Sequence, residues 1–254
     1  MKVLVMDFDG VVSDSVHEAF IVAIRTFLDL YPDSPLEPTD GEGASHPLFG
    51  SFMDLMPLGN GAADYGTILA ALQAGAELRD QETYDAFRAG LDPDGLERYV
   101  RRFYETRSEM AAADPEGWRN LMKPYAPFLD LLRRRAGRGV TYAIATSKDG
   151  DSVEVLLRDY GIADLIPLER VVDRGAGPRK SVHLERLRAR LGLDFDVMTF
   201  IDDKVNHLDS VASLGARCAL AAWGYNGRRE HELAAERGYL VCDLDNVEEK
   251  LFED

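Results

Sequence analysis

The chain has 254 residues, of which 46% are hydrophobic, and a formal net charge of −16 at pH 7. This length is enough for one large domain or two modest ones with a sizeable apolar core. The acidic balance argues against nucleic acids and anionic membranes as partners, because both recruit basic surfaces. We find no apolar run long enough to span a membrane and no cleavage site of a signal peptide. The two cysteines, Cys218 and Cys242, do not form a metal-binding cluster. We therefore expect a cytoplasmic protein with two reduced thiols.

The first predicted strand is the apolar run Val3–Met6, which Asp7-Phe8-Asp9-Gly10 follows directly. Carboxylates two residues apart can share one face, and the carboxyl ends of parallel strands form a ligand crevice. Two neighbouring carboxylates are costly to desolvate, so they usually accompany a cation or carry out acid–base chemistry. The simpler alternative is a solvent-exposed Asp-x-Asp-Gly turn. The motif by itself does not decide between a functional carboxylate pair and such a turn.

A long interval without a convincing strand runs from about Val16 to about Lys123. Three prolines and the stretch Asp40-Gly41-Glu42-Gly43 indicate a loop early in this interval. We therefore expect a helical insertion of about 100 residues, the size of a domain, over the carboxyl end of the first strand. The helices predicted within it are His17–Leu30, Asn60–Ala74, Asp80–Ala89 and Pro93–Ala113.

The rest of the chain alternates strands and helices, which is typical of βαβ units and a parallel sheet. The predicted fold class is α/β, with a core of residues 1–15 and 124–254 and an all-helical insertion of residues 16–123. The predicted strands are Thr141–Ala145, a weaker one near Leu168–Val172, Val197–Ile201, Cys218–Ala222 and Tyr239–Cys242. The predicted helices are Ala126–Arg135, Ser152–Tyr160, Ser181–Leu191 and His207–Leu214.

Polar side chains follow two of the later strands. Thr146-Ser147-Lys148-Asp149-Gly150 comes after Thr141–Ala145, and its hydroxyls and N–H groups suit a phosphate, although a simple helix N-cap is an alternative. Asp202-Asp203-Lys204 comes after Val197–Ile201 and offers the hard oxygen ligands that Mg²⁺ prefers. The alternative for this second pair is an acidic helix start.

One lysine, Lys180, follows a glycine-rich loop and precedes a predicted helix. A cation near a helix N-terminus is unfavourable unless an anion lies nearby, although a surface lysine is the simpler alternative. Each of these signals is weak alone. In sequence they supply a carboxylate pair, a hydroxyl, a lysine and a second acidic pair, and the ends of parallel strands converge. We therefore expect these groups to share one crevice.

Together these motifs resemble those of the haloacid dehalogenase superfamily of phosphohydrolases. Residues 7–15 resemble its nucleophile motif, Ala145-Thr146-Ser147 the second motif, Lys180 the third and Asp202-Asp203 the fourth. Segments that resemble phosphoglycolate phosphatase-like members are Leu214-Gly215-Ala216 and Trp223-Gly224-Tyr225. The resemblance implies a Rossmann-like, doubly wound parallel sheet with a helical cap between the first and second motifs.

The resemblance also implies catalytic roles. Asp7 would attack phosphorus to give an aspartyl-phosphate, and Asp9 would protonate the leaving oxygen and then activate water. Thr146 would hold phosphoryl oxygens with nearby N–H groups, and Lys180 would neutralise charge near Asp7. The remaining phosphate-binding candidates are Ser147 and Gly10.

For the metal, the resemblance implies Mg²⁺ bound by Asp7, the Asp9 carbonyl oxygen and Asp203, with Asp202 assisting. Many relatives have glycine in place of Asp202, and many have another acid where this chain has Asn206 and His207. The sequence therefore leaves open whether Asp202 or Asp203 contacts the metal directly.

The resulting prediction is a Mg²⁺-dependent phosphatase acting on a small phosphorylated metabolite, as a monomer or homodimer. An acid two residues after the nucleophile suits the departure of an alkoxide, so Asp9 favours phosphate-ester hydrolysis over dehalogenation. A sugar phosphomutase remains an alternative, as does a catalytically silent binding or regulatory protein, against which the intact motifs argue. A dinucleotide-binding enzyme is disfavoured because no Gly-x-Gly-x-x-Gly follows the first strand.

Three arginines of a predicted helix are candidates for contacting a second anionic group of the substrate, namely Arg101, Arg102 and Arg107. The alternative is that they form a solvated helix face.

Overall fold

The structure is a computed structural model that describes residues 1–39, 43–59 and 61–252. The chain divides into two compact units. One joins Met1–Asp14 to Pro124–Asp254, and the other is Ser15–Lys123. We refer to them as the α/β unit and the helical unit and describe each by itself.

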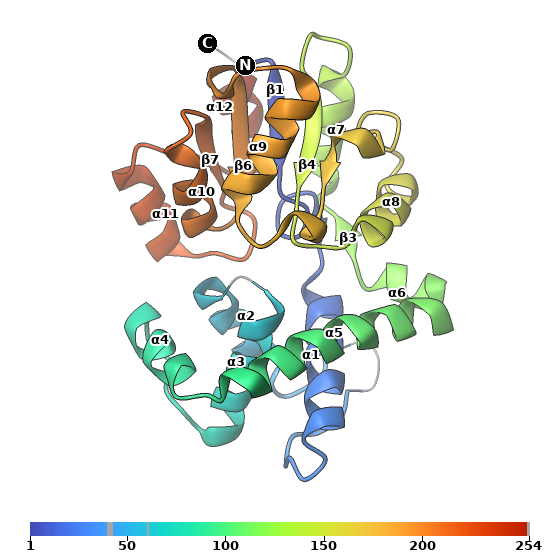
Figure 1. The fold of residues 1–254 in the computed structure, drawn as a ribbon, viewed down its shortest axis with the longest axis vertical. Coiled ribbons are helices and arrows are strands. Elements are labelled where there is room, and N and C mark those ends of the chain that lie inside the picture. The colour runs from blue at the N-terminus through green and yellow to red at the C-terminus, as the bar shows by residue number, and fades with distance from the viewer. Residues whose placement is uncertain (40–42, 60, 253–254) are drawn as a thin grey trace. The chain divides into compact units, whose positions relative to one another are not determined.

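The α/β unit is built on a six-stranded sheet of order β5-β4-β1-β6-β7-β8, in which every pair of neighbours is parallel (Figure 1). This topology confirms the predicted α/β fold class. β1 is an inner strand of this sheet and pairs with β4 on one side and β6 on the other. The strands are β1 (Val3–Met6), β4 (Thr141–Ala145), β5 (Val171–Val172), β6 (Met198–Asp202), β7 (Arg217–Ala221) and β8 (Leu240–Cys242).

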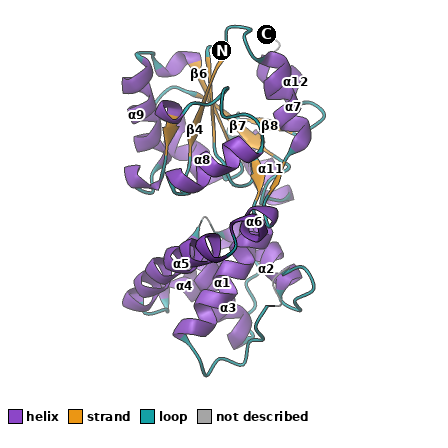
Figure 2. Cartoon of the chain, turned by 90° about the vertical axis from the view of Figure 1, so that its right-hand side faces the viewer, coloured by secondary structure: helices purple, strands orange, loops and turns teal. Residues whose placement is uncertain are grey.

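Helices cover both faces of this sheet, which explains why β1 is apolar without alternation. Val3 and Val5 belong to the core cluster that includes residues of α9 (Lys180–Leu191) and α10 (Val205–Ala212). Leu4 and Met6 alternate with them and are equally inaccessible to solvent. Figure 2 shows α9 on one side of the sheet and α7 (Ala126–Arg135) and α12 (Val247–Phe252) on the other. The unit also contains α8 (Gly150–Asp159), α11 (Arg228–Glu236) and short 3₁₀ turns at Leu168–Arg170, Arg174–Ala176 and Phe195–Val197.

The helical unit contains six α-helices among its described residues. Their inward faces form an aromatic core in which Phe20, Phe52 and Phe103 are almost fully buried. Asp92 caps α5 through its side chain, and a proline occupies the first turn, where its missing N–H costs nothing. The helices are α1 (Val16–Leu30), α2 (Phe49–Leu55), α3 (Ala62–Ala74), α4 (Gln81–Ala89), α5 (Pro93–Ala113) and α6 (Pro115–Asn120), and a 3₁₀ turn spans Met56–Leu58.

Two short strands, β2 (Ser13–Asp14) and β3 (Lys123–Pro124), pair as a separate two-stranded sheet. Across the described part of the chain, every helix is too short or too polar to cross a membrane.

Some predicted boundaries differ from the structure. The weak strand is confined to Val171–Val172, and a 3₁₀ turn replaces its first half. Residues 40–42 of the predicted loop and Asn60 of a predicted helix lie outside the described residues. Four short helices of six to nine residues were not predicted, because helices of this length show little periodicity. They are α2, α6, α11 and α12.

The three arginines proposed as candidates for a second anionic group do not share one solvated face. Arg107 is buried, and its guanidinium donates to both carboxylate oxygens of Glu18 at 2.6 and 2.8 Å. The indole N–H of Trp118 also donates to Glu18, at 3.3 Å. Arg102 pairs with Asp29 and Glu109. The expectation of a solvated face is therefore wrong for Arg107, which is held by a buried carboxylate of the same unit.

Both cysteines are buried, in β7 and β8, and both are free thiols. Burial raises the pKa of Cys218 to about 12 and that of Cys242 to about 11. Because the thiolate is the reactive form, we expect a thiol reagent at pH 8 to label neither residue in the folded protein and both in denaturant. Rapid stoichiometric labelling of the native protein, followed by mass spectrometry, would contradict this burial.

Candidate active site

Three adjacent strands end at one edge of the sheet and bring polar residues together there. Asp7 follows β1, Thr146 follows β4, and Asp202 is the last residue of β6. The backbone extends this pairing, since the Asp7 N–H donates to the Ile201 carbonyl at 2.9 Å. The strand order β4-β1-β6 thus places the three side chains side by side, as parallel strand ends require.

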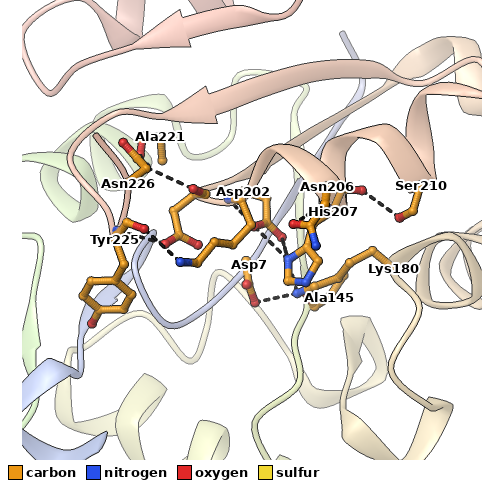
Figure 3. Close-up of polar contacts among 12 residues, drawn as sticks. Asp7, Ala145, Lys180, Asp202, Asn206, His207, Ser210, Ala221, Tyr225 and Asn226 are labelled. Carbon is orange, nitrogen blue, oxygen red and sulfur yellow. Dashed lines mark hydrogen bonds and ion pairs between the residues drawn. The ribbon is translucent and has the colours of Figure 1, made fainter. Parts of the chain in front are cut away.

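Lys180 contacts all three of these strand ends from the first turn of α9 (Figure 3). Its side chain is inaccessible to solvent, and its Nζ donates to the Ala145 carbonyl at 2.7 Å. The same Nζ lies 2.8 Å from Asp7 Oδ1 and 3.4 Å from Asp202 Oδ2. Burial acts to lower the pKa of Lys180, but Asp7 and Asp202 outweigh it and raise the pKa above its usual value. The buried lysine therefore stays charged.

Asp7 has one carboxylate oxygen engaged and one open. Oδ1 accepts the Phe8 N–H at 2.7 Å and contacts Lys180, whereas Oδ2 has no donor among the described residues. Burial raises the pKa of Asp7 to about 6, although the nearby Lys180 acts in the opposite direction. The carboxylate is thus poorly solvated and has an oxygen available to a ligand.

Asp202 is fully buried and contacts an imidazole. Its Oδ1 and Oδ2 lie 3.0 and 3.1 Å from His207 Nδ1, and Oδ1 accepts the Lys204 N–H at 2.9 Å. Burial opposes ionisation, but His207 and Lys180 hold the pKa of Asp202 well below its usual range. Asp202 is therefore an anion in the floor of the site.

Asp203 turns the other way, toward the loop after β7. Its Oδ2 accepts the Tyr225 N–H at 2.9 Å, and burial raises its pKa to about 7 against the effect of Lys204. Gly10 has a φ of +83°, and a Cβ there would lie 2.6 Å from this oxygen. Glycine at this position thus allows the turn after β1 to approach the Asp203 carboxylate closely.

One group of donors in this site has the arrangement of a metal centre. Asp7, Asp202 and His207 each offer one ligand atom, and these atoms all lie within 4.8 Å of one another. Two of the donors are carboxylates buried beside each other, and this arrangement suits a divalent cation. Within the described residues, Asp203 is not part of this group.

A second lysine, Lys148, contacts the predicted acid–base residue. Its Nζ lies 3.1 and 3.4 Å from the two carboxylate oxygens of Asp9, and its side chain is inaccessible to solvent. The Lys148 N–H also donates to Oγ1 of the buried Thr146 at 3.1 Å. Ser147 is half-buried, and its side chain makes no hydrogen bond to the described residues. Lys148 thus contacts both Asp9 and Thr146, although the sequence analysis gave it no role.

A family model described as a haloacid dehalogenase-like hydrolase matches residues 1–215. The chain belongs to this family. It is accordingly a hydrolase of the haloacid dehalogenase-like family, and the resemblance found in its motifs is confirmed. The predicted Rossmann-like class agrees with the parallel sheet. No curated protein gives a significant sequence match.

Several solved structures share the fold of this haloacid dehalogenase-like hydrolase. A predicted phosphoglycolate phosphatase from Haemophilus somnus is 19% identical, with a TM-score of 0.66, over 98% of this chain and 97% of its own. A haloacid dehalogenase-like family protein from Streptococcus pneumoniae is 14% identical, with a TM-score of 0.65, over 98% of both chains. A predicted phosphatase from Clostridium acetobutylicum is 15% identical, with a TM-score of 0.63, over 100% of this chain and 99% of its own.

Two residues of the site had no role in the sequence analysis, although each left a signal. Lys148 stands two positions after Thr146, in a segment that suited phosphate binding. His207 stands five positions after Asp202, where many relatives carry an acid. Of the two, only His207 is a departure from the motif that a comparison with such relatives can identify.

Proposed function

We propose that this hydrolase is a Mg²⁺-dependent phosphatase of a small phosphorylated metabolite. The observation that carries the proposal is the pairing of Asp7, which has an open carboxylate oxygen, with the buried cation of Lys180. A phosphate dianion needs positive charge to approach Asp7 and Asp202, and Lys180 contacts both. The names of two structural neighbours, which refer to phosphatases, support the same substrate class.

In this proposal Asp7 is the nucleophile and Asp9 is the general acid and base. An Asp7 oxygen forms a bond to phosphorus, the ester P–O bond breaks, and the leaving alkoxide takes a proton from Asp9. Water then attacks phosphorus and gives a proton to the Asp9 carboxylate, while the bond to Asp7 breaks and phosphate leaves. Lys148, which lies 3.1 Å from Asp9, would hold that carboxyl group in place through both steps.

The phosphoryl oxygens would be held by Lys180, by the Thr146 hydroxyl and by backbone groups near Gly10 and Ser147. Asp7, the Asp9 carbonyl oxygen and the Asp202–Asp203 pair are the proposed Mg²⁺ ligands. The metal, when bound, would offset charge on the phosphoryl group. Among these ligands, the distances favour Asp202 over Asp203 as the partner of Asp7.

We further propose that the helical unit, residues 15–123, acts as the cap that selects the substrate. Within this unit the carboxylate of Glu18 is paired with Arg107. Arg107 is therefore committed to an internal partner, and substrate recognition would depend on other side chains of the unit.

Phosphate release from a panel of phosphorylated metabolites tests this function. We expect release that requires Mg²⁺ and stops with a chelator, and 2-phosphoglycolate is the first substrate to test because of the neighbour's name. Asp9→Asn should lower the release by about a hundredfold or more, the usual contribution of a general acid–base group.

Three results would contradict the proposal. Chloride release from a 2-haloacid without phosphate release would indicate dehalogenation. Conversion of a sugar 1-phosphate to its 6-phosphate without free phosphate would indicate a mutase. Absence of metal-dependent turnover across the whole panel would favour a binding protein.

A further inference from the structure

A nitrogen donor lies among the carboxylates of the candidate metal centre. His207 is in the first turn of α10, its side chain is 14% exposed, and its Nδ1 lies 3.0 Å from Asp202 Oδ1 (Figure 3). The atom that faces the carboxylates is therefore a ring nitrogen that can ligate a metal. His207 thus adds a third potential ligand to those of Asp7 and Asp202.

The spacing of these donors agrees with a shared ion. In octahedral coordination with bonds of about 2.1 Å, adjacent donors lie about 3.0 Å apart and opposite donors about 4.2 Å apart. The distance of 3.0 Å from His207 Nδ1 to Asp202 Oδ1 matches the adjacent arrangement. The ligand atoms of Asp7, Asp202 and His207 all lie within 4.8 Å of one another. Small side-chain movements would therefore bring Asp7 to the same ion.

The contacts of Lys180 leave suitable oxygens for this ion. The lysine engages Oδ1 of Asp7 and Oδ2 of Asp202. Oδ2 of Asp7 has no donor among the described residues, and Oδ1 of Asp202 is the oxygen nearest to His207. A metal between these atoms and Nδ1 would replace the hydrogen bond that now joins His207 to Asp202.

We propose that His207 Nδ1 can ligate, with Asp7 and Asp202, a divalent first-row transition metal, and that this nitrogen raises the affinity of the site for such an ion relative to Mg²⁺. The proposal rests on the proposed function in taking Asp7 and Asp202 as metal ligands. Mg²⁺ is bound by oxygen and dehydrates reluctantly, whereas imidazole suits the later first-row ions. One nitrogen among two carboxylates therefore shifts the preference away from Mg²⁺ without excluding it.

The test uses metal ions alone with the full-length, metal-free protein. Pulsed electron paramagnetic resonance of bound Mn²⁺ should detect a nitrogen coupling that changes when the histidines are labelled with ¹⁵N. The coupling should disappear in His207→Asp, which supplies an oxygen donor instead. It should persist in His231→Asp, because His231 contacts Asn226 and is outside the group of three donors.

Calorimetric titrations with Co²⁺ and Mg²⁺ give a second measurement. His207→Asp should reduce the preference for Co²⁺ over Mg²⁺ by about tenfold, whereas His231→Asp should leave the preference unchanged. If His207→Asp unfolds, His207→Asn provides the same comparison with the side chain still able to contact Asp202.

Failure to bind Mn²⁺, absence of nitrogen coupling, or an unchanged metal preference in His207→Asp would overturn the proposal. Absence of nitrogen coupling or an unchanged preference would show that His207 at most orients Asp202 through a hydrogen bond, and failure to bind Mn²⁺ would remove the metal centre at these three residues. Because no substrate is present, these outcomes are separate from those of the phosphate-release assay. An enzyme that releases phosphate without nitrogen coupling would retain the proposed function and lose only this inference.

Discussion

Asp7→Asn is expected to lower phosphate release by at least about a thousandfold, because an amide cannot take the place of the attacking carboxylate. The substitution removes the anion whose open oxygen would form the bond to phosphorus. The loss should fall on kcat, and rapid quenching with mass spectrometry should detect a phosphorylated wild-type enzyme and no phosphorylated variant.

The fold of Asp7→Asn should be intact, so that the loss reports on chemistry. Asparagine has nearly the same volume and keeps an oxygen for the Phe8 N–H, and Lys180 retains Asp202 as a partner. Asp151→Asn, at an exposed position in α8, is the matched control and should keep full activity. Phosphate release by Asp7→Asn at the wild-type rate would remove Asp7 as the nucleophile.

Much of the fold follows from patterns that the sequence carries openly. The strand Val3–Met6 is buried on both faces, so its apolar run is unbroken and was predicted with its observed bounds. The helix Pro93–Ala113 is long and amphipathic and begins at a proline after a capping aspartate, so its bounds were also predicted. By contrast, α12 has only six residues and no periodicity strong enough to identify it.

The candidate site was predictable in its location and less so in its contacts. Strand order alone brings Asp7 and Asp202 to one edge of the sheet. Asp202 and Asp203 are consecutive, so their side chains point in opposite directions, and nothing in the sequence determines which one faces Asp7. The answer depends on the register of β6, which pairs Met6 with Ile201 and brings the next residue, Asp202, beside Asp7.

The contacts of Lys148 and His207 depend on side-chain direction after a strand end or within a helix. Lys148 lies in the turn after Thr146, where its N–H bonds the Thr146 hydroxyl and its Nζ contacts Asp9. His207 reaches Asp202 because α10 starts two residues after the aspartate pair. Such directions are set by packing of the whole unit, which a motif does not encode.

Lys180→Met is expected to destabilise the folded, metal-free protein by about 3–5 kcal/mol, the usual cost of removing one partner of a buried ion pair. The change would leave Asp7 and Asp202 buried beside each other without the ammonium group that contacts both. Urea unfolding followed by circular dichroism measures this loss. Lys123→Met, at an exposed position, is the control and should change the free energy of unfolding by less than about 0.5 kcal/mol.

The cause of this destabilisation can be separated from a simple loss of packing by a second substitution. If the cost comes from uncompensated carboxylates, adding Asp202→Asn to Lys180→Met should recover part of the stability, because one of the two charges is removed. The two changes would then be non-additive, as expected for residues in direct contact. Additive losses in the double variant would instead attribute the effect to the shape of the Lys180 side chain, and Lys180 would then not be the counter-ion of these carboxylates.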